Sequence, residues 1–222
     1  VYLHGSTSRN CIIFGNTGTV DQPNYGSGGG STAFEHCCTI PDAGGSNITD
    51  EPLFADADYH LQATSPCIDG GWNIGGTDHG MDGTPRPLDG DADGTATTDI
   101  GCYEYCNRGA DSDGDVMTDG FEMDYGLDPT DPADEHGNLD GDPMDNRDEF
   151  IADTNPTDPA SYFCITAVSN NSPVTLYFES SSNRWYTMLG CSNLVDGVWT
   201  NVPGAGPVQG VGGADSAIDT ND

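Results

Sequence analysis

Short apolar runs separated by turn-forming residues make up the first 105 residues. The runs lie at 11–14, 33–38, 52–54, 59–62 and 66–68, and clusters of Gly, Asn, Asp and Ser separate them. Because helical periodicity is absent, we expect strands of three to five residues joined by turns. This pattern is typical of a β-solenoid or a small β-sandwich.

The last segment, residues 161–222, alternates apolar and polar positions instead. The alternation runs through 163–168, 174–180, 184–190 and 198–202. Alternation with a period of two predicts half-buried antiparallel strands. This part of the chain is therefore expected to form a small antiparallel β-sheet module.

Between these two segments, residues 106–160 contain an internal repeat with an offset of 27. The twelve-residue window 111–122 (DSDGDVMTDGFE) aligns with 138–149 (NLDGDPMDNRDE), and LDPTDP at 127–132 aligns with TNPTDP at 154–159. Composition bias alone does not place acidic residues at the same positions in two copies. The repeat therefore indicates a geometry that both copies share.

The spacing within each window matches calcium coordination. Ca²⁺ takes six to eight oxygen ligands at about 2.3–2.6 Å, and a tight loop supplies them from positions 1, 3, 5, 7, 9 and 12, with a backbone carbonyl at position 7. The first window predicts a site formed by Asp111, Asp113, Asp115, the Met117 carbonyl, Asp119 and Glu122. The second predicts a site formed by Asn138, Asp140, Asp142, the Met144 carbonyl, Asn146 and Glu149. Single helical turns at 121–125 and 148–152 would hold each Glu, and Gly126 would cap the first turn.

The windows depart from an EF-hand at position 6, where an EF loop has Gly with a positive φ angle. Val116 and Pro143 occupy that position here, and proline locks φ near about −65°. The alternative to a metal site is a solvated acidic linker. Two like charges 4 Å apart repel by about 1 kcal/mol in water and about 4 kcal/mol at an effective dielectric constant of 20. Asp at every second position therefore favours a bound divalent cation over a linker.

A third acidic cluster, DGDADGTATTD, lies upstream of the repeat and has Asp at positions 1, 3, 5 and 11. It lacks a closing Glu and a repeat partner. A further calcium site would use Asp89, Asp91, Asp93 and Asp99. A turn rich in Asp and Gly accounts for the pattern equally well.

The charge balance excludes several classes of function. The chain has 37 acidic residues, 30 of them Asp, against five Arg and no Lys, so its formal net charge is −32. A field of that sign repels nucleic acid and anionic lipid. No apolar run is long enough to span a membrane. Lyase chemistry needs a base such as Lys or Arg, and the five His lie in no catalytic spacing. The sequence therefore predicts a protein that is not an enzyme.

Eight cysteines in this composition point to an oxidising, extracellular setting, although several could be buried free thiols. Cys164 and Cys191 are the only two in the last third, so they form the first disulfide pair to test. Cys11, Cys38 and Cys67 are 27 and 29 residues apart, which fits one solenoid coil each. No Cys and His spacing predicts zinc.

The first segment also resembles a known family. NCIIFGNTG, HCCTIPDAGGSNITDEPLFAD, YHLQATSPCIDGG and DGTPRPLDGDADGTATTDIGCYEY resemble, in this order, the last coils and the adjoining "choice-of-anchor" segment of bacterial right-handed parallel β-helix proteins. The resemblance implies a secreted or surface-attached protein with further coils upstream. Part of that wider fold group cleaves polysaccharides, but its catalytic coils have no counterpart here.

The other two segments carry resemblances as well. The repeat resembles the thrombospondin type 3 repeats of bacterial surface proteins, which implies that Asp128, Asp131 and Asp158 contribute to these or to further ions. RWYTMLGCSNLVDGVWTNVPG resembles the small C-terminal β-sandwich modules that follow such repeats. A further strand usually ends those modules, so the last strand is expected to be missing. Trp185 and Trp199 are expected in the core, although an exposed pair could stack on sugar rings.

Together these patterns predict a mainly β protein in three parts. These are β-helix coils and a cap segment at 1–105, paired calcium-binding repeats at 106–160 and a small antiparallel β-sandwich at 161–222. The predicted function is that of an extracellular, cell-surface structural protein that binds at least two Ca²⁺ ions. Both ends look unfinished, which fits either a fragment of a longer chain or head-to-tail self-association into a filament, and glycans are a further possible partner. The alternative is the non-catalytic C-terminal part of a calcium-dependent polysaccharide-degrading or carbohydrate-binding enzyme.

Overall fold

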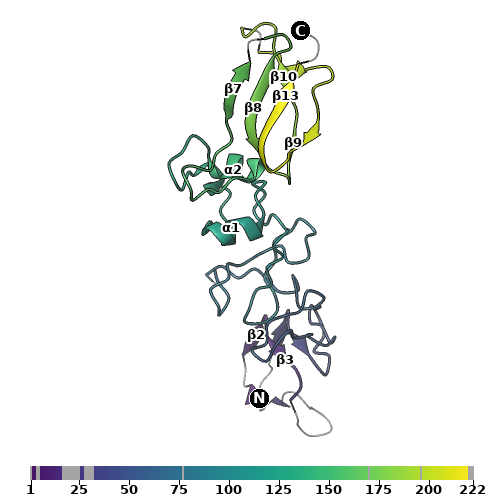
Figure 1. Ribbon diagram of the computed structural model, residues 1–222. Coiled ribbons are helices and arrows are strands. Elements are labelled where there is room, and N and C mark those ends of the chain that lie inside the picture. Colours follow the sequence, from purple (N-terminus) through teal and green to yellow (C-terminus); the bar gives the residue numbers. More distant parts are fainter. Residues whose placement is uncertain are drawn as a thin grey trace. The chain divides into compact units, whose positions relative to one another are not determined.

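The structure is a computed structural model that describes residues 2–3, 6–16, 26–27, 33–76, 78–169, 171–195 and 197–219 (Figure 1). It has 21% strand and 9% helix, which confirms the prediction of a mainly β chain. The chain divides into two compact units, Val1–Asp134 and Glu135–Asp222. The division lies between the two acidic windows, so each window belongs to a different unit. Among the described residues, no helix is long and apolar enough to cross a membrane.

Three pairs of short parallel strands begin the first unit. They are β1 (Tyr2–Leu3) with β4 (Gly26–Ser27), β2 (Thr7–Arg9) with β5 (Ala33–Glu35), and β3 (Ile12–Ile13) with β6 (Cys38–Thr39). Thr7 is the register partner of Ala33, and Ile12 is the register partner of Cys38. Each parallel pairing requires the chain to return and run again in the same direction. Cys38 also forms a parallel bridge with Ile48, so the chain returns once more.

A small apolar core and a buried polar network hold the rest of this unit. The core contains Cys38, Leu61, Cys67 and Ile100. In the network, the Arg86 Nε donates to Glu104 Oε2 at 2.8 Å, and the same carboxylate accepts from the backbone amides of Leu88 and Asp99. Asp99 in turn accepts from the amides of Asp69 and Tyr105. These long-range bonds fix loops that have almost no regular secondary structure.

Two seven-residue helices follow the acidic loops. α1 spans Asp119–Tyr125 and α2 spans Asn146–Ala152, and the 3₁₀ turn η1 (Asp134–His136) lies between them. Thr118 and Asp145 are their N-caps, because each side chain accepts a bond from the amide three residues later. Left-handed residues, Gly126 and Asp153, end them. The predicted helical turns are present and begin two residues earlier than expected, directly after their N-caps.

The second unit contains an antiparallel sheet in the order β13-β8-β7. The strands are β7 (Ile165–Ser169), β8 (Thr175–Ser180) and β13 (Gly213–Ile218). Two further antiparallel pairs are β9 (Trp185–Tyr186) with β12 (Val208–Gln209), and β10 (Leu189–Gly190) with β11 (Thr200–Asn201). The sequence pattern missed β12 and β13. β13 consists mainly of small and polar residues, and its pairing with β8 along the full length makes it a strand.

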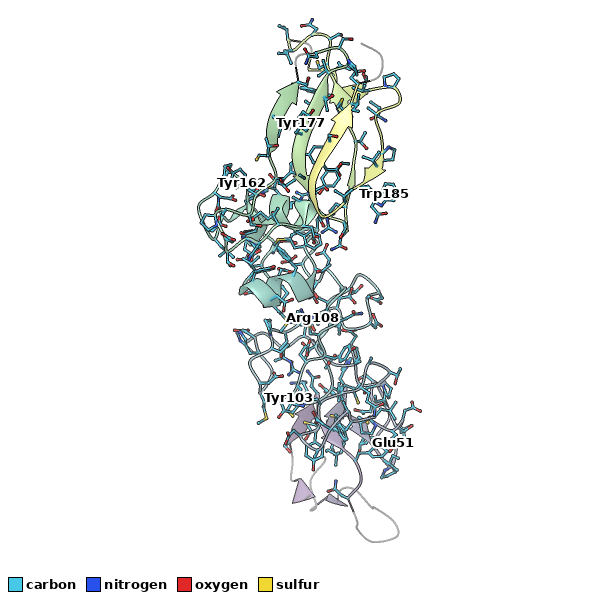
Figure 2. The ribbon with its side chains drawn as sticks, viewed as in Figure 1. Glu51, Tyr103, Arg108, Tyr162, Tyr177 and Trp185 are labelled. Carbon is cyan, nitrogen blue, oxygen red and sulfur yellow. The ribbon has the colours of Figure 1, made fainter. Side chains whose placement is uncertain are left out.

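The prediction that Trp185 and Trp199 belong to the core is wrong. Their exposed fractions are 65% and 57%, and the side chain of Trp185 lies on the outside of the second unit (Figure 2). The rings of Phe163, Phe178 and Tyr186 pack together instead, with centroids 5.1–5.7 Å apart. Successive residues of a strand point to opposite faces, so an inward Tyr186 turns Trp185 outward.

Candidate metal centres

The first acidic loop is organised around Asp111. Its carboxylate accepts hydrogen bonds from the amides of Gly114 at 2.8 Å, Asp115 at 3.1 Å and Val116 at 3.0 Å. The backbone bond from the Asp119 amide to the Ala110 carbonyl, at 2.9 Å, closes the loop. Val116, at the sixth position, has a φ angle of 88°. The loop thus adopts a positive φ at this position, although valine is a poor residue for it.

Five carboxylates form two overlapping groups beside this loop. Oxygens of Asp111, Asp113 and Asp115 lie within 4.8 Å of one another, and so do oxygens of Asp115, Glu122 and Asp134. An ion with metal–oxygen distances of about 2.4 Å spans that separation between opposite ligands. Glu122 is fully buried, and neither of its carboxylate oxygens has a hydrogen-bond partner. A buried carboxylate without partners is costly unless a cation contacts it.

The electrostatics of the first group match this geometry. Burial, together with the neighbouring charges of Asp113 and Asp115, raises the pKa of Glu122 to about 9. Burial and the charge of Asp115 together raise the pKa of Asp113 to about 6. A positive charge among these groups would favour their ionised forms.

The second loop repeats this arrangement 27 residues later. The amide of Asn146 donates to the Gly137 carbonyl at 2.8 Å, as that of Asp119 does to Ala110. Oxygens of Asp140, Asp142 and Glu149 lie within 4.8 Å of one another. Glu149 is fully buried, and its Oε1 accepts a bond from Thr154 at 3.3 Å, whereas Oε2 has no partner. Burial raises the pKa of Glu149 to about 7, and Asp142 and Asp140 add to the shift.

The remaining predicted ligands of the two loops have varied surroundings. Asp119 is fully buried, and its carboxylate accepts from the amide and the hydroxyl of Ser112, at 2.9 and 2.7 Å. Asn138 accepts from the Gly141 amide and donates to the Asp142 carbonyl. Asn146 and Met117 are buried at the expected places, and Met144 is half-buried. The bonds of Asp119 and Asn138 hold the loops in shape.

The three acidic residues predicted from the family resemblance alone cap turns. Asp128 accepts from the amide and the hydroxyl of Thr130, and Asn155 makes the same two bonds to Thr157. Asp131 and Asp158 accept from the amides of Ala133 and Ala160, each at 3.1 Å. None of the three joins a metal-binding group of the described residues. An amide replaces the carboxylate at the position equivalent to Asp128, so a negative charge is not needed there.

Asp134 is the ligand candidate that the sequence pattern missed. It lies outside the twelve-residue window, and the equivalent position of the second repeat is Ser161. Both side chains cap the same turn: Asp134 Oδ2 accepts from the Asp128 amide at 2.8 Å, and Ser161 Oγ accepts from the Asn155 amide at 3.0 Å. Only Asp134 is a carboxylate, and one of its oxygens lies within 4.8 Å of oxygens of Asp115 and Glu122. In the sequence, the signal for this ligand was a difference between the two copies of the repeat, Asp134 in the first and Ser161 in the second.

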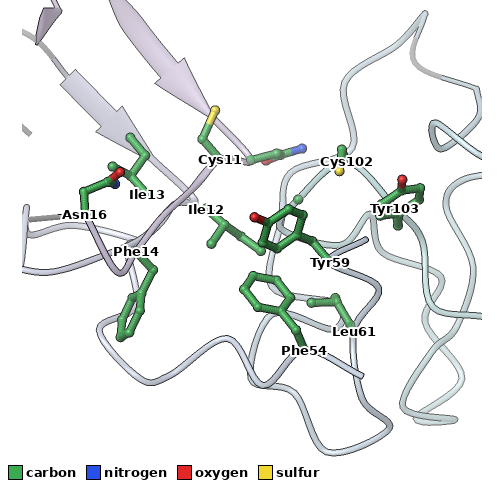
Figure 3. A pocket seen from close by; sticks show the side chains of 12 residues that line it. Cys11, Ile12, Ile13, Phe14, Asn16, Phe54, Tyr59, Leu61, Cys102 and Tyr103 are labelled. Carbon is green, nitrogen blue, oxygen red and sulfur yellow. The ribbon is translucent and has the colours of Figure 1, made fainter. Parts of the chain in front are cut away.

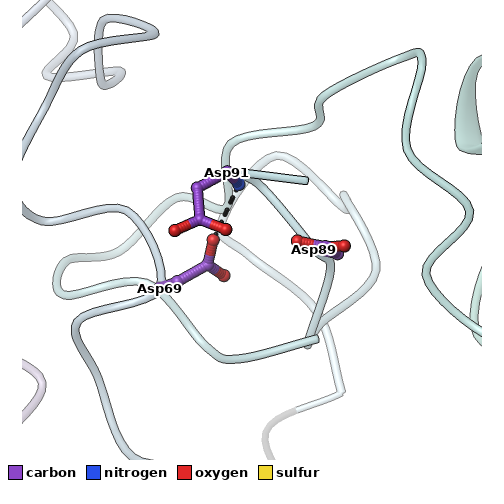
Figure 4. A group of neighbouring side chains, drawn as sticks. All are labelled: Asp69, Asp89 and Asp91. Carbon is purple, nitrogen blue, oxygen red and sulfur yellow. Dashed lines mark hydrogen bonds between the residues drawn. The ribbon is translucent and has the colours of Figure 1, made fainter. Parts of the chain in front are cut away.

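The upstream cluster forms a third group, and its membership differs from the sequence prediction. Asp69 joins Asp89 and Asp91 (Figure 4), whereas Asp93 and Asp99 stay outside. Asp99 is buried in the network with Glu104 described above, and burial raises its pKa to about 8. Both oxygens of Asp89 accept backbone amides, from Asp93 and Gly94. A turn held by Asp side chains accounts for these bonds without a cation.

The positive charges of the protein lie elsewhere. All five Arg are among the described residues, and each pairs with a carboxylate outside the two windows. The pairs are Arg9–Glu35, Arg86–Glu104, Arg108–Asp124, Arg147–Glu135 and Arg184–Asp153. The chain has no Lys, so these five pairs account for all of its Arg and Lys charges.

A cavity of about 560 Å³ in the first unit offers a different kind of site (Figure 3). Its walls are mainly apolar and aromatic, and Phe54 packs edge-on against Tyr59 with centroids 5.2 Å apart. No Asp, Glu, His, Arg or Lys is among its lining residues. The titratable side chains of its lining are those of Cys11, Tyr59, Cys102 and Tyr103.

Comparisons with known proteins give no match for this chain. No family model, no curated protein and no solved structure matches it. Its function must therefore be inferred from its own residues.

Proposed function

We propose that the chain is an extracellular structural protein in which the two acidic loops bind Ca²⁺. The observation that carries this proposal is Glu122, a fully buried carboxylate whose two oxygens have no hydrogen-bond partner. Three further carboxylates lie around it, from Asp113, Asp115 and Asp134. Burial of unpaired charge is one of the most costly features that a fold can contain. A bound cation removes that cost.

The ligand chemistry favours Ca²⁺ over other cations. The groups contain only oxygen donors, which hard cations prefer, whereas Zn²⁺ prefers nitrogen and sulfur. Mg²⁺ demands octahedral geometry and keeps several waters, so it fits poorly with a fully buried glutamate. Ca²⁺ accepts six to eight oxygens in flexible geometry and binds the bidentate glutamate of such loops. Millimolar extracellular calcium saturates sites with dissociation constants of about 10⁻⁴ M.

Calcium titration with calorimetry, combined with thermal unfolding, tests the proposal. The intact chain is expected to bind at least two Ca²⁺ ions, and EDTA is expected to lower its melting temperature. Mg²⁺ at the same concentration serves as the control cation and is expected to restore little stability. An unchanged melting curve in EDTA, together with no calcium binding in the titration, would refute the proposal.

The parallel strand pairs support the β-helix interpretation of the first segment. The stretch 33–39 runs parallel to the stretch 7–13 through two strand pairs, as neighbouring coils of a parallel β-helix do. We therefore propose that residues 1–105 form the end of such a helix and its cap segment. The antiparallel strands after Tyr162 support the proposed β-sandwich. On this proposal, the acidic repeats are calcium-stiffened spacers.

The exposed tryptophans favour a second candidate function, carbohydrate binding by the second unit. Trp185 and Trp199 each expose more than half of their surface, and exposed aromatic rings can stack on sugar rings. A glycan array separates this function from a purely structural one. Binding that disappears in Trp185→Ala and Trp199→Ala variants would support it, and an array without any bound glycan would contradict it.

Self-association is a further part of the proposal. β7 is an edge strand of its sheet, and four of its five residues are exposed. Edge strands offer unpaired backbone groups to another chain. Light scattering in calcium-containing buffer is expected to show head-to-tail assemblies, and discrete monomers at all protein concentrations would count against them.

A further inference from the structure

Two pairs of cysteines are neighbours in the first unit. Cys11 and Cys37 directly precede the paired strands β3 and β6, and Cys38 and Cys67 belong to one buried core cluster. In each pair the two thiols shift the pKa of each other. Cys37, Cys38 and Cys67 are fully buried. All four cysteines are free thiols in the structure. They come from three segments that are far apart in the sequence.

The strand register explains the first pair. Ile12 is the register partner of Cys38, and the Cys38 amide donates to the Cys11 carbonyl at 3.0 Å. One step earlier on the two neighbouring segments, Cys11 therefore lies beside Cys37. Neighbouring strands are about 4.7–4.9 Å apart, and disulfides join residues whose Cα atoms are about 4.4–6.8 Å apart. The backbone separation of this pair is in the range that a disulfide needs.

The core explains the second pair. Cys38 and Cys67 belong to the same buried cluster, which Leu61 and Ile100 complete. Consecutive residues of an extended segment point to opposite faces, so Cys37 and Cys38 direct their thiols to different partners. No metal-ligating group of three or more side chains among the described residues contains a cysteine. The four thiols are thus two separate pairs and do not form one metal site.

We propose that Cys11 forms a disulfide bond with Cys37 and that Cys38 forms a second one with Cys67. Each bond forms when the two thiols lose two protons and two electrons to a low-molecular-weight or protein disulfide, which is reduced to two thiols. One cysteine thiolate attacks a sulfur of the oxidant and releases the first thiolate of the oxidant, which leaves a mixed disulfide. The second cysteine thiolate then attacks the protein sulfur of that mixed disulfide and releases the second thiolate of the oxidant. This proposal concerns a different region from the cation sites and does not depend on them.

The burial of the thiols decides when the bonds can form. The thiolate is the attacking species in disulfide exchange, and it has to reach the oxidant. Because Cys37 and Cys38 are fully buried in the folded protein, the exchange has to occur during folding, while the thiols are still accessible.

The two bonds would stabilise a part of the fold that has little regular structure and a small core. β3 and β6 contain only two residues each, and the buried core here is small. Small secreted domains with little core commonly use disulfides in this way. The bonds join cysteines that are 26 and 29 residues apart, lengths at which a disulfide restricts the unfolded chain considerably.

Thiol counting and peptide mapping of the intact chain test the proposal. The protein is refolded with oxidised and reduced glutathione, unfolded, alkylated with N-ethylmaleimide, weighed and digested with pepsin. Four of the eight cysteines are expected to be alkylated. Reduction is expected to lower the melting temperature by on the order of 10 °C. Alkylation of all eight, or a cross-link from Cys37 to Cys38 or Cys67, would overturn the proposal.

Serine variants separate the two bonds, since Cys37 and Cys38 share a peptide. Cys11→Ser is expected to leave five alkylated cysteines and to retain the cross-link from Cys38 to Cys67. Cys67→Ser is expected to retain the cross-link from Cys11 to Cys37. Cys191→Ser is the matched control, because its half-buried thiol donates only to the Asn193 carbonyl, at 3.1 Å. The control is expected to keep both bonds, and the wild-type map remains decisive if a variant fails to fold.

Discussion

Replacement of Glu122 by Gln is expected to change stability in opposite directions with and without calcium. In the cation-free protein, burial and the charges of Asp113 and Asp115 raise the Glu122 pKa from 4.5 to about 9. A carboxyl group with a raised folded-state pKa favours folding below its unfolded pKa of 4.5. That advantage is lost as the pH rises toward 9. The neutral amide of Gln does not carry this penalty.

The magnitude follows from the two pKa values. Between pH 4.5 and pH 7 the unfolded chain releases the proton and the folded chain keeps it, and each pH unit costs about 1.4 kcal/mol. At pH 7 the wild-type glutamate therefore costs about 3 kcal/mol, and at pH 5 it costs less than about 1 kcal/mol. In EDTA at pH 7, Glu122→Gln is expected to melt on the order of 5 °C higher than the wild type.

Calcium reverses this order. A ligand present at 1,000 times its dissociation constant stabilises the folded state by about 4.1 kcal/mol, which exceeds the penalty of about 3 kcal/mol. The wild type gains this energy, whereas Glu122→Gln has lost a charged, bidentate ligand and gains less. Differential scanning calorimetry at pH 5 and pH 7, in EDTA and in calcium, measures all four conditions. Asp128→Asn is the matched control, since Asn155 makes the equivalent bonds in the second repeat, and it is expected to behave like the wild type.

One result would refute the reasoning. If Glu122→Gln melts below the wild type in EDTA at pH 7, and calcium raises both proteins equally, then Glu122 is not an ion ligand held at an energetic cost. The buried carboxylate would then be satisfied in some other way in solution.

Three further predictions concern the loops. Asp134→Ser is expected to weaken calcium binding in the first loop about tenfold, and Ser161→Asp is expected to strengthen it in the second loop. Isothermal titration calorimetry measures both affinities. Equal affinities in the wild type and the two variants would contradict the role of Asp134. Val116→Gly is expected to raise the free energy of unfolding by about 1 kcal/mol in urea titrations, because it relieves the strained positive φ angle, whereas the matched change Pro143→Gly is expected to lower it. In EDTA, the melting temperature of the wild type is expected to fall between pH 5 and pH 8, because the pKa values of Glu122 and Glu149 are raised in the folded state. Calcium is expected to remove most of this pH dependence. A melting temperature that does not change with pH in EDTA would argue against the burial of both groups.

The sequence by itself determined the local features of the two loops. The acidic spacing, the N-cap side chains Thr118 and Asp145 and the left-handed Gly126 act over a few residues, so their pattern can be read directly from the chain. The helical turns and the convergence of Asp113, Asp115 and Glu122 follow from that pattern. The mainly β character also followed from short-range alternation.

Only the tertiary structure decided which distant residues meet. Asp134 reaches the Glu122 group because a turn, folded by its own Asp and Thr bonds, returns the chain to the loop. The upstream group likewise contains Asp69 and not the predicted Asp93 and Asp99. Asp69 reaches it through a hydrogen bond from the Asp91 amide, across 22 residues of sequence. Trp185 faces outward because Tyr186 already packs against Phe163 and Phe178. In each of these cases, contacts between residues far apart in the sequence decide which side chains meet. A local sequence pattern does not specify those contacts or their free energy.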